Sequence, residues 1–452
     1  MSLYGTCYRA VLWPVYEAVR RRKTWNHWRA AEQRQWWSAE QIAEFQFAEL
    51  RRLVDHAYQH SAWYRKRWQT LGMTPDQIQK LDDFRRLPLV SKEDIRQHAE
   101  EMLADNFAAL AYEHRTGGST GVPLRFFLHR SSYEWRLAVS MRGYRWAGCE
   151  DGERQFYVWG QPIGAPPLLQ RLKVSFHNAV LRRRVVSSFQ FGEAQIQECL
   201  RQLNAFRPRV VVGYTSALCL LAKHILETNA PVVALQGIIT AAESVSRVQR
   251  DLIEQAFHAP VFASYGSREF MLIGMECEKH HGLHLSADNL LVEVLRPDGA
   301  PVANGELGEI VVTDLHNYAL PFLRYRIGDL GVMSNRACAC GRGLPLLDRV
   351  EGRILDVIRT PDGRIVPGEF FPHLLKEFDA IHQFQVVQKQ LDCLILKLVL
   401  RPGEHKEQLR RLDQELRRVL GSHIMVQIET VANIPLTPSG KFRVTVSELS
   451  PP

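Results

Sequence analysis

Hydrophobic positions change their spacing along the chain, and each change predicts a different kind of structure. In the first 110 residues apolar side chains recur at helical spacing, as at Phe47, Leu50 and Val54, which is the pattern of helices with one buried face. Ser91 and Asp94 stand three residues apart before another such stretch and fit a capping box. The first quarter is therefore predicted to be helical.

Between residues 155 and 267 short apolar runs alternate with longer amphipathic stretches. The runs are too short for helices and almost wholly apolar, which is typical of strands buried on both faces. Alternation of this kind predicts βαβ units and a parallel sheet. Strands are expected at 155–159, 209–213, 237–240 and 260–264, helices at 193–206, 216–229 and 245–257, and a β-rich stretch at 285–332.

The last hundred residues have the pattern of a separate α+β unit. A strand pattern covers 384–400, Leu412 and Leu416 share the apolar face of a following helix, and a further strand is expected at 424–428. The boundary is placed near residue 352, which divides the chain into 1–351 and 352–452. The predicted fold class is α/β, with a large N-terminal domain of helices around mixed or parallel sheets and a small α+β C-terminal domain.

Composition and charge narrow the function only slightly. The 452 residues are 46% hydrophobic and 23% charged, with a formal net charge of +8, which is ordinary for a globular protein of more than one domain. A basic protein suits polyanionic ligands such as nucleotides, coenzyme A or nucleic acid, or an anionic membrane surface. No nucleic-acid recognition module is found. The short basic runs at 20–23 and 182–184 are interpreted as solvated faces.

The first 23 residues are apolar and then basic, the reverse of the order in a secretory signal. They predict an amphipathic helix that docks on the domain, or alternatively one that lies on a membrane surface. No apolar run is long enough for a spanning helix. Five of the eight cysteines are isolated in apolar or helical settings, and such usage in a large chain predicts reduced thiols and a cytoplasmic location.

Residues 116–121, Thr-Gly-Gly-Ser-Thr-Gly, place three glycines and three hydroxyls in six positions. Glycines let successive backbone N–H groups approach an anion closely, so the segment is a candidate phosphate loop. It is not a Walker loop, because no lysine follows Gly121 and residues 125–129 predict a strand instead of a helix. The alternative interpretation is an ordinary turn.

Three other segments carry candidate chemistry of the same kind. Tyr265 and Glu269 follow a predicted strand, at the sheet edge where α/β proteins bind ligands; Glu269 could hold a metal and Tyr265 could stack on a base. Asp329 follows a glycine turn and could accept hydrogen bonds from both ribose hydroxyls. Lys441 lies on a Ser-Gly loop near the C-terminus and could swing over a phosphate. Each residue alone is more commonly a turn or surface residue.

Taken in order, these motifs and the segments at 242–243 and 352–356 resemble the adenylate-forming superfamily of acyl–coenzyme A ligases. The chain looks most like the phenylacetate–coenzyme A ligase branch, including its capsule-polysaccharide relatives, and the resemblance covers nearly the whole sequence. It implies an AMP-forming ligase that converts an acyl or aryl acid to an acyl-adenylate with ATP and Mg²⁺ and then to a thioester with coenzyme A. It also implies that the small domain rotates between the two steps.

The resemblance implies a role for each matched position. Binding of the ATP phosphates is assigned to Thr116, Gly117, Gly118, Ser119, Thr120 and Gly121. Ala242 and Glu243 match the segment on the adenine side, and Tyr265 and Gly266 match the family's Tyr-Gly pair. Asp329 would bind the ribose, with Arg353 beside it. Glu269 would be the magnesium-side acid, and Lys441 would contact the α-phosphate and the carboxylate. Arg268 occupies the place of the family's usual threonine at the α-phosphate. Leu355 occupies the place of the hinge acid, with Asp356 one position later.

Two further sets of residues are candidates. Trp159 and Tyr214 are interpreted as lining the acid pocket, or alternatively as core aromatics. Zinc takes four Cys or His ligands in a closed structural site. The candidate ligands are Cys277, His284, Cys338 and Cys340, with His281 as a substitute for His284. Relatives in the branch carry a similar set, which the resemblance interprets as structural zinc. The alternative is reduced surface thiols beside a solvated histidine cluster.

Two other functions remain open from the sequence. One is an adenylyltransferase that leaves AMP on a hydroxyl or sugar-type acceptor in polysaccharide or cofactor biosynthesis. The other is a degenerate nucleotide-binding scaffold. Lys441, Asp329 and Glu269 argue against the scaffold, whereas Arg268 argues for it. A homodimer is also expected.

Overall fold

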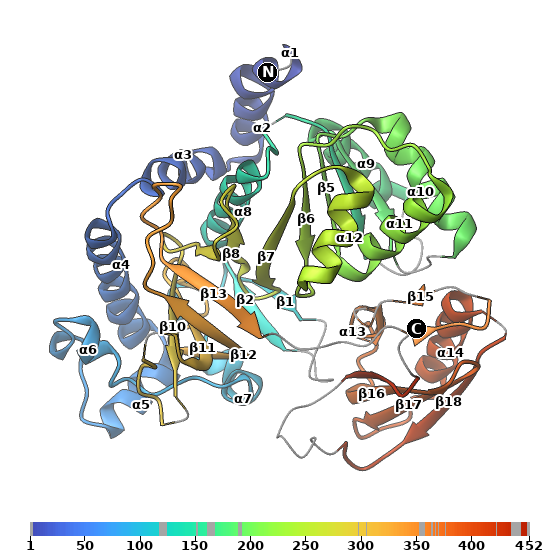
Figure 1. The fold of residues 1–452 in the computed structure, drawn as a ribbon. Helices are drawn as coiled ribbons and strands as arrows, with labels where there is room; N and C mark the ends of the chain where they lie inside the picture. The colour runs from blue at the N-terminus through green and yellow to red at the C-terminus, as the bar shows by residue number, and fades with distance from the viewer. Residues whose placement is uncertain are drawn as a thin grey trace.

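The structure is a computed structural model, and it describes residues 3–116, 124–150, 152–160, 168–188, 192–296, 298–303, 305–351, 358–362, 365–366, 368, 370–375, 377–421, 423–434 and 444–449. A large N-terminal part holds a long mixed sheet with helices on both sides, and a smaller C-terminal part lies below the carboxyl ends of the sheet's parallel strands in Figure 1. The segment 352–357, which contains the predicted boundary, lies outside the described residues.

The first hundred residues are helical, as the spacing predicted. The helices are α1 (Leu3–Cys7), α2 (Trp13–Arg20), α3 (Thr24–Arg34), α4 (Ala39–His60), α5 (Ala62–Thr70), α6 (Leu81–Phe84) and α7 (Lys92–Met102). Leu50 and Val54 of α4 are fully buried. The capping box before α7 is also confirmed, because Ser91 Oγ accepts from the Asp94 N–H and Asp94 Oδ2 accepts from the Ser91 N–H.

The predicted parallel sheet is confirmed and forms one half of an eleven-stranded sheet. Its parallel strands are β4 (Arg183–Ser187), β3 (Gln155–Trp159), β5 (Val210–Tyr214), β6 (Gly237–Ala241) and β7 (Val261–Ser267), in that spatial order. The predicted helices are α10 (Glu193–Phe206), α11 (Thr215–Thr228) and α12 (Arg247–Phe257). Strands β5 and β6 are buried along their whole length, which explains their continuous apolar sequence.

The other half of the sheet is antiparallel and begins where β8 pairs with β7. In spatial order from β7 the strands are β8 (Met271–Glu276), β9 (Leu283–Leu285), β13 (Leu346–Glu351), β12 (Tyr325–Ser334), β11 (Leu307–Asp314) and β10 (Leu290–Leu295). The direction of the strands therefore changes at β7, in the middle of the sheet.

The elements that were not predicted include α8 (Arg130–Trp146), α9 (Leu168–Val180) and β4. α8 is buried on several faces and carries two fully buried arginines, Arg136 and Arg142, so its sequence lacks a simple apolar stripe. The interpretation of 182–184 as a solvated face is wrong for two of the three arginines. Arg182 lies over the Tyr4 ring at 4.5 Å, and Arg183 donates to Gln155 Oε1 at 3.1 Å.

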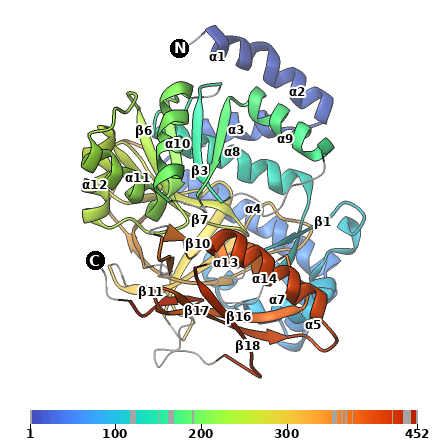
Figure 2. The same cartoon turned by 90° about the vertical axis from the view of Figure 1, so that its right-hand side faces the viewer.

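The C-terminal part is the α+β unit that the pattern predicted. Its sheet has the order β18 (Met425–Thr430), β17 (Cys393–Leu400), β16 (Ile381–Gln390) and β19 (Thr445–Ser447), and a small pair is formed by β14 (Ile358–Arg359) and β15 (Ile365–Val366). The strand pattern over 384–400 proves to be a hairpin that turns at 391–392. Helices α13 (Phe370–Leu375) and α14 (Lys406–Leu420) accompany this sheet (Figure 2), and Leu412 and Leu416 are buried as expected.

Among the described residues, the helices are either too short or too polar to cross a bilayer.

Candidate functional site

The candidate residues gather at the carboxyl ends of β6 and β7. In open α/β sheets this edge binds ligands where the strand order or direction changes, and β7 is the strand that is parallel to β6 but antiparallel to β8. Ala242 directly follows β6 with a left-handed φ of 65°, so the chain turns sharply there. Glu243 follows, while Tyr265 and Gly266 lie at the end of β7.

The Tyr265 hydroxyl lies 3.0 Å from Oδ2 of Asp329. Asp329 belongs to β12, so this hydrogen bond joins two motifs that are 64 residues apart and on strands that are not neighbours in the sheet. The phenol donates because a carboxylate at neutral pH only accepts. The bond fixes the orientation of a carboxylate that the sequence assigned to ribose.

Gly266 allows the close approach of two backbones beside this pair. A Cβ at this position would lie 2.0 Å from the carbonyl oxygen of Met271, and β7 and β8 change register at this point. Met271 itself has a φ of 59°. The tight turn that carries Arg268 and Glu269 therefore requires glycine at its start.

Glu269 is 5% exposed, and its Oε1 accepts a hydrogen bond from the Tyr325 hydroxyl at 3.1 Å. The Glu269 carbonyl accepts from Nε of Arg136 at 3.0 Å, and Arg136 is paired with Asp314 at 2.5 Å, with both side chains buried. Burial raises the pKa of Asp314, and the Arg136 charge opposes that rise. A buried, hydrogen-bonded frame thus fixes the position of Glu269.

Arg268 lies near the base of the candidate phosphate loop. Burial lowers the pKa of His114 in strand β1 (Tyr112–Arg115), and the charge of Arg268 is the next cause. β1 pairs with β2 (Arg125–Leu128), which confirms the strand expected after the loop. Thr116 closes this hairpin, because its N–H donates to the Leu124 carbonyl and its Oγ1 accepts from the Leu124 N–H, both at 2.9 Å.

The segment 117–121 between these strands lies outside the described residues, as do Arg353, Leu355, Asp356 and Lys441. Their roles therefore stay predictions from the sequence.

Glu243 accepts two hydrogen bonds from Ser216 in the first turn of α11. The Ser216 N–H lies 2.6 Å from Oε2 and the Ser216 hydroxyl 2.9 Å from Oε1. Burial raises the pKa of Glu243, and both bonds oppose that rise. The start of a helix is favourable for a negative side chain. Ser216 and Tyr325 were not predicted as partners of these acids, although each lies close in the sequence to a predicted site residue, Tyr214 and Asp329 respectively.

Trp159 and Tyr214 lie at the ends of β3 and β5 with ring centroids 4.7 Å apart. Tyr214 is 1% exposed and belongs to the apolar core, and Trp159 is half-buried. The pair is adjacent, as expected of residues that share one wall. The burial of Tyr214 agrees equally with its interpretation as a core aromatic.

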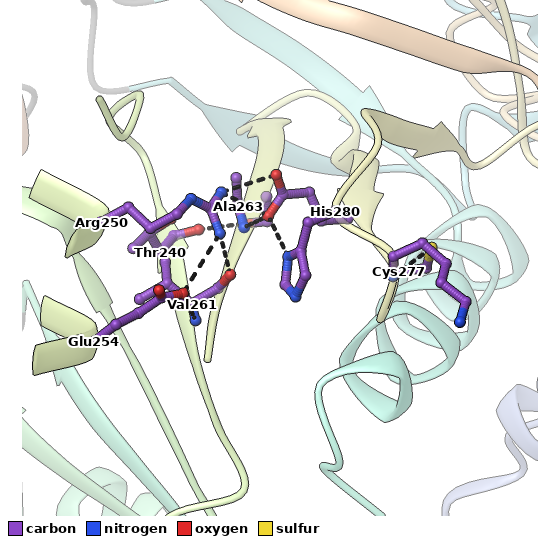
Figure 3. Close-up of polar contacts among 10 residues, drawn as sticks. Thr240, Arg250, Glu254, Val261, Ala263, Cys277 and His280 are labelled. Carbon is purple, nitrogen blue, oxygen red and sulfur yellow. Dashed lines mark hydrogen bonds and ion pairs between the residues drawn. The ribbon is translucent and has the colours of Figure 1, made fainter. Parts of the chain in front are cut away.

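An ion-pair network joins β7 to its neighbours α12 and β8 (Figure 3). Both oxygens of Glu276 accept from Nη2 of Arg250 at 2.8 Å, and Oε2 also accepts from the Ala263 N–H at 2.8 Å. His280 Nδ1 lies 3.2 Å from the same Oε2. This network ties α12, β7 and β8 together immediately before Cys277.

Cys277, His284, Cys338 and Cys340 come together, as the sequence predicted, and their ligand atoms all lie within 4.8 Å of one another. Cys277 Sγ is 3.6 Å from Cys338 Sγ, and Cys340 Sγ is 3.3 Å from His284 Nε2. A tetrahedral zinc with Zn–S bonds of about 2.3 Å separates its sulfurs by about 3.8 Å, so these distances fit that ion. His281 is exposed and is not part of the cluster.

The surroundings of the cluster also fit a metal. His284 Nδ1 lies 3.4 Å from the Leu344 carbonyl, which favours a proton on Nδ1 and leaves Nε2 facing the sulfurs. The Lys279 and Arg342 N–H groups point at Cys277 Sγ and Cys340 Sγ, at 3.4 and 3.5 Å. Such donors stabilise thiolates, the ligand form of cysteine.

The two parts of the chain touch near the phosphate-loop hairpin. Arg115 Nη1 of β1 lies 2.7 Å from Oδ1 of Asp379, which precedes β16. The Arg115 side chain is 47% exposed and that of Asp379 is 78% exposed, and exposed pairs contribute little free energy. The contact is therefore easily broken.

Comparison with known proteins finds relatives along most of the chain. Residues 358–448 match the family described as the CapK C-terminal domain. Protein CapK of Staphylococcus aureus is 26% identical over 373 residues, which cover 81% of either chain. Phenylacetate-coenzyme A ligase of Escherichia coli is 24% identical over 426 residues, 90% of this chain and 95% of the relative.

Among solved structures, 2-hydroxyisobutyryl-CoA ligase in complex with 2-HIB-AMP and CoA has a TM-score of 0.64 at 21% identity and covers 92% of both chains. The chain therefore shares the fold of this ligase. The relatives that match most of the chain are named phenylacetate-coenzyme A ligase and CapK, and this similarity supports that branch of the superfamily. The resemblance drawn from the motifs and the predicted fold class are confirmed.

Proposed function

We propose that this chain is an ATP-dependent acid–coenzyme A ligase that forms an acyl-adenylate and then a thioester. The observation that carries the proposal is the hydrogen bond between Tyr265 and Asp329. It joins the two nucleotide motifs at the sheet edge where α/β proteins bind ligands. The curated relatives named phenylacetate-coenzyme A ligase, which match most of the chain, support the same activity.

In the first step a carboxylate oxygen of the acid attacks the α-phosphorus of ATP, and the bond to pyrophosphate breaks. Both reactants are anionic, so the site must neutralise charge and align the two groups. Arg268 and Lys441 are the cations that we assign to this task, and residues 116–121 supply backbone N–H donors to the other phosphates. Asp329 and Arg353 hold the ribose, and Ala242 and Glu243 form the adenine side.

Glu269 is the residue that would hold Mg²⁺. A single buried carboxylate suits this ion, which takes one or two protein carboxylates together with substrate phosphates. Bound there, Mg²⁺ supplies charge neutralisation at the phosphates. The Tyr325 hydroxyl on Oε1 keeps the carboxylate in place.

In the second step the sulfur of coenzyme A attacks the acyl carbon, AMP leaves, and the thiol proton passes to solvent. The small domain carries Lys441, so we propose that it turns away before the thiol enters. An exposed contact such as Arg115 to Asp379 offers little resistance to that motion. We assign Trp159 and Tyr214 to the acid pocket, which favours an aryl acid.

We also propose a structural zinc held by Cys277, His284, Cys338 and Cys340. These residues come from β9 and from segments adjoining β8 and β12, so the ion would link three strands of the antiparallel half. Arg342, which adjoins the cluster, also donates to Gln35 Oε1 at 3.0 Å, and the site thereby reaches the N-terminal helices. The expected homodimer and cytoplasmic location stay predictions.

The test is mass spectrometry of the products from ATP, Mg²⁺ and a panel of aryl and acyl acids, with and without coenzyme A. Free AMP and an acyl-thioester from one acid would establish the ligase and name its substrate class. A product that retains AMP would identify an adenylyltransferase. No nucleotide turnover with any acid would contradict the proposal and favour a binding scaffold.

A further inference from the structure

Helix α2 and the residues before it expose apolar side chains at the end of the molecule farthest from the C-terminal part (Figure 1). Val11, Val15 and Val19 are 52%, 56% and 77% exposed, and their spacing of four residues places them on one helix face. Tyr8 and Trp13 are 3% and 6% exposed and pack inward. The segment thus has one face on the protein and a second apolar face in solvent.

Helix α9 lies beside it and is even less covered. Leu169, Leu172 and Phe176 are 73%, 58% and 68% exposed and also share one helix face. None of the side chains described in α9 is buried. The helix is held at its end, where Tyr4 donates to the Val180 carbonyl at 3.0 Å and Tyr16 lies 3.4 Å from His177 Nδ1.

The net positive charge of the chain is concentrated in these two segments, because acids balance the lysines and arginines in the rest of the sequence. Residues 3–23 and 168–188 each contain five lysines or arginines, and their only acid is Glu17. Their net charge is therefore +9, against +8 for the whole chain. Glu17 is 8% exposed and accepts the Trp25 N–H at 2.8 Å, so it is turned away from solvent.

Exposed cations adjoin these apolar residues in the sequence. Arg20 ends α2, Arg21 and Lys23 follow it, and all three are exposed. Arg171 and Lys173 are exposed on α9 and alternate in sequence with its apolar residues. We call the exposed apolar residues of α2 and α9, together with these five cations, the basic apolar surface. Solvent-exposed apolar side chains gathered on adjoining helices usually mark a docking site.

We propose that the basic apolar surface binds the face of an anionic lipid bilayer, with the two helices lying in the interfacial plane. Amphipathic helices with aliphatic or aromatic residues on one side and Lys or Arg beside them bind such interfaces, and each cation adds attraction to anionic headgroups. A second copy of the chain is disfavoured, because a symmetric contact would set +9 against +9. For the first 23 residues the sequence predicted either docking on the protein or binding to a membrane surface. In this proposal one face of the helix packs on the protein and the other face binds the membrane.

The test is flotation of the full-length protein with vesicles of phosphatidylcholine alone or mixed with phosphatidylglycerol. The bound fraction should be about fivefold or more greater on the mixed vesicles, and it should fall as salt is raised. Binding requires no ATP, acid or coenzyme A. The outcome is therefore independent of whether the proposed ligase activity is correct.

Two double variants separate the apolar and the electrostatic contributions to vesicle binding. Leu169→Ser with Phe176→Ser should lower binding to mixed vesicles about tenfold or more, and Arg171→Glu with Lys173→Glu should lower it by a similar factor. Because all four side chains are exposed, circular dichroism and the melting temperature should match the wild type.

Matched controls lie elsewhere on the surface. Val248→Ser, at a side chain that is 78% exposed on α12, and Arg51→Glu with Lys66→Glu on α4 and α5 should bind mixed vesicles as the wild type does. Equal binding to both kinds of vesicle, or equal binding by surface and control variants, would overturn the proposal. So would a dimer in sedimentation velocity that Leu169→Ser with Phe176→Ser abolishes, since the surface would then join two copies.

Discussion

The Tyr265 hydroxyl donates to Oδ2 of Asp329 across 3.0 Å and so links the end of β7 to the middle of β12. The two strands are separated in the sheet by β8, β9 and β13. The bond therefore joins two strands that are not neighbours in the sheet and fixes one carboxylate in a defined orientation. An acceptor with two oxygens, held in this way, suits a pair of vicinal hydroxyls.

Tyr265→Phe tests this relationship directly. Loss of one hydrogen bond of about 1 kcal/mol should raise KM for ATP about fivefold, with a smaller change in kcat, because ribose binding contributes equally to ground and transition states. Steady-state kinetics in the acid-dependent assay would measure it. Tyr58→Phe is the control, since its hydroxyl accepts only a 3.4 Å contact from Gln69 on distant helices. An unchanged KM for ATP would mean that Asp329 does not depend on Tyr265.

The sequence predicted the parallel half of the sheet well because its strands are buried on both faces and therefore consist of short apolar runs. Strand β4 was not predicted because Arg182 precedes it and Arg183 begins it, and their guanidinium groups lie over the rings of Tyr4 and Tyr157. Helix α8 was not predicted because two of its buried residues, Arg136 and Arg142, are charged and form ion pairs. Periodicity detects burial of apolar side chains, not burial of paired charges.

The candidate site was predicted as a set of motifs, and the structure supplied their partners. Glycine and turn patterns indicated Gly266 and Asp329. Local sequence does not determine which distant hydroxyl group forms a hydrogen bond with which acid. The bonds from Tyr325 to Glu269 and from Ser216 to Glu243 depend on tertiary packing. The cluster of three cysteines and one histidine was predicted from the sequence because these residue types are chemically distinctive, and the fold brings His284 instead of His281 to the cysteines.

Metal analysis tests the zinc proposal. Protein purified without chelator should contain about one zinc per chain, because three thiolates and one imidazole complete a closed tetrahedral site. Cys277→Ser should lose the metal and melt several degrees lower, since an ion that binds only the folded state stabilises it. Burial raises the pKa of the Cys277 thiol to about 12 when no ion is present, so ionisation of this thiol depends on the ion.

Cys7→Ser serves as the matched control, because Cys7 is exposed and remote from the cluster. It should retain the full zinc content and the wild-type melting temperature. Metal-free wild-type protein with unchanged stability would remove the proposal, and equal zinc loss in both variants would place the ion elsewhere.

Acid sensitivity should follow from His316. Burial lowers the pKa of this side chain to about 3, while its ring stacks on Trp135 at 4.2 Å. The unfolded state binds a proton below about pH 6.5 and the folded state does not, so stability is complete above that pH and is lost as pH falls. One such histidine lowers the free energy of unfolding by about 2 kcal/mol between about pH 7 and pH 5.

Urea unfolding of His316→Gln at both pH values would measure that contribution. The variant keeps a donor for the Asp288 carbonyl, which accepts from Nε2 at 2.9 Å, and its loss of stability on acidification should be smaller by the amount stated above. His382→Gln, at an exposed position of β16, should keep the full pH dependence. Identical pH dependence in His316→Gln and wild type would show that His316 is protonated in the folded protein.

Lys441 is the residue whose replacement best separates the two chemical steps. It is assigned to the α-phosphate and the carboxylate, so Lys441→Ala should slow formation of the acyl-adenylate about a hundredfold to a thousandfold, the usual effect of removing one electrostatic contact to a transition state. Pyrophosphate release in a single turnover would report that step. Lys389→Ala, at an exposed lysine in the same domain, should leave it unchanged.

The rate of thioester formation, the second step, shows whether Lys441 acts on the α-phosphate or positions the small domain. With chemically prepared acyl-adenylate and coenzyme A, Lys441→Ala should form thioester at nearly the wild-type rate, because the domain has turned away and Lys441 no longer contacts the reacting atoms. If both steps slow equally, Lys441 instead positions the domain as a whole, and the α-phosphate must be neutralised by Arg268. Arg268→Gln would then show the larger defect in pyrophosphate release, which the same assay detects.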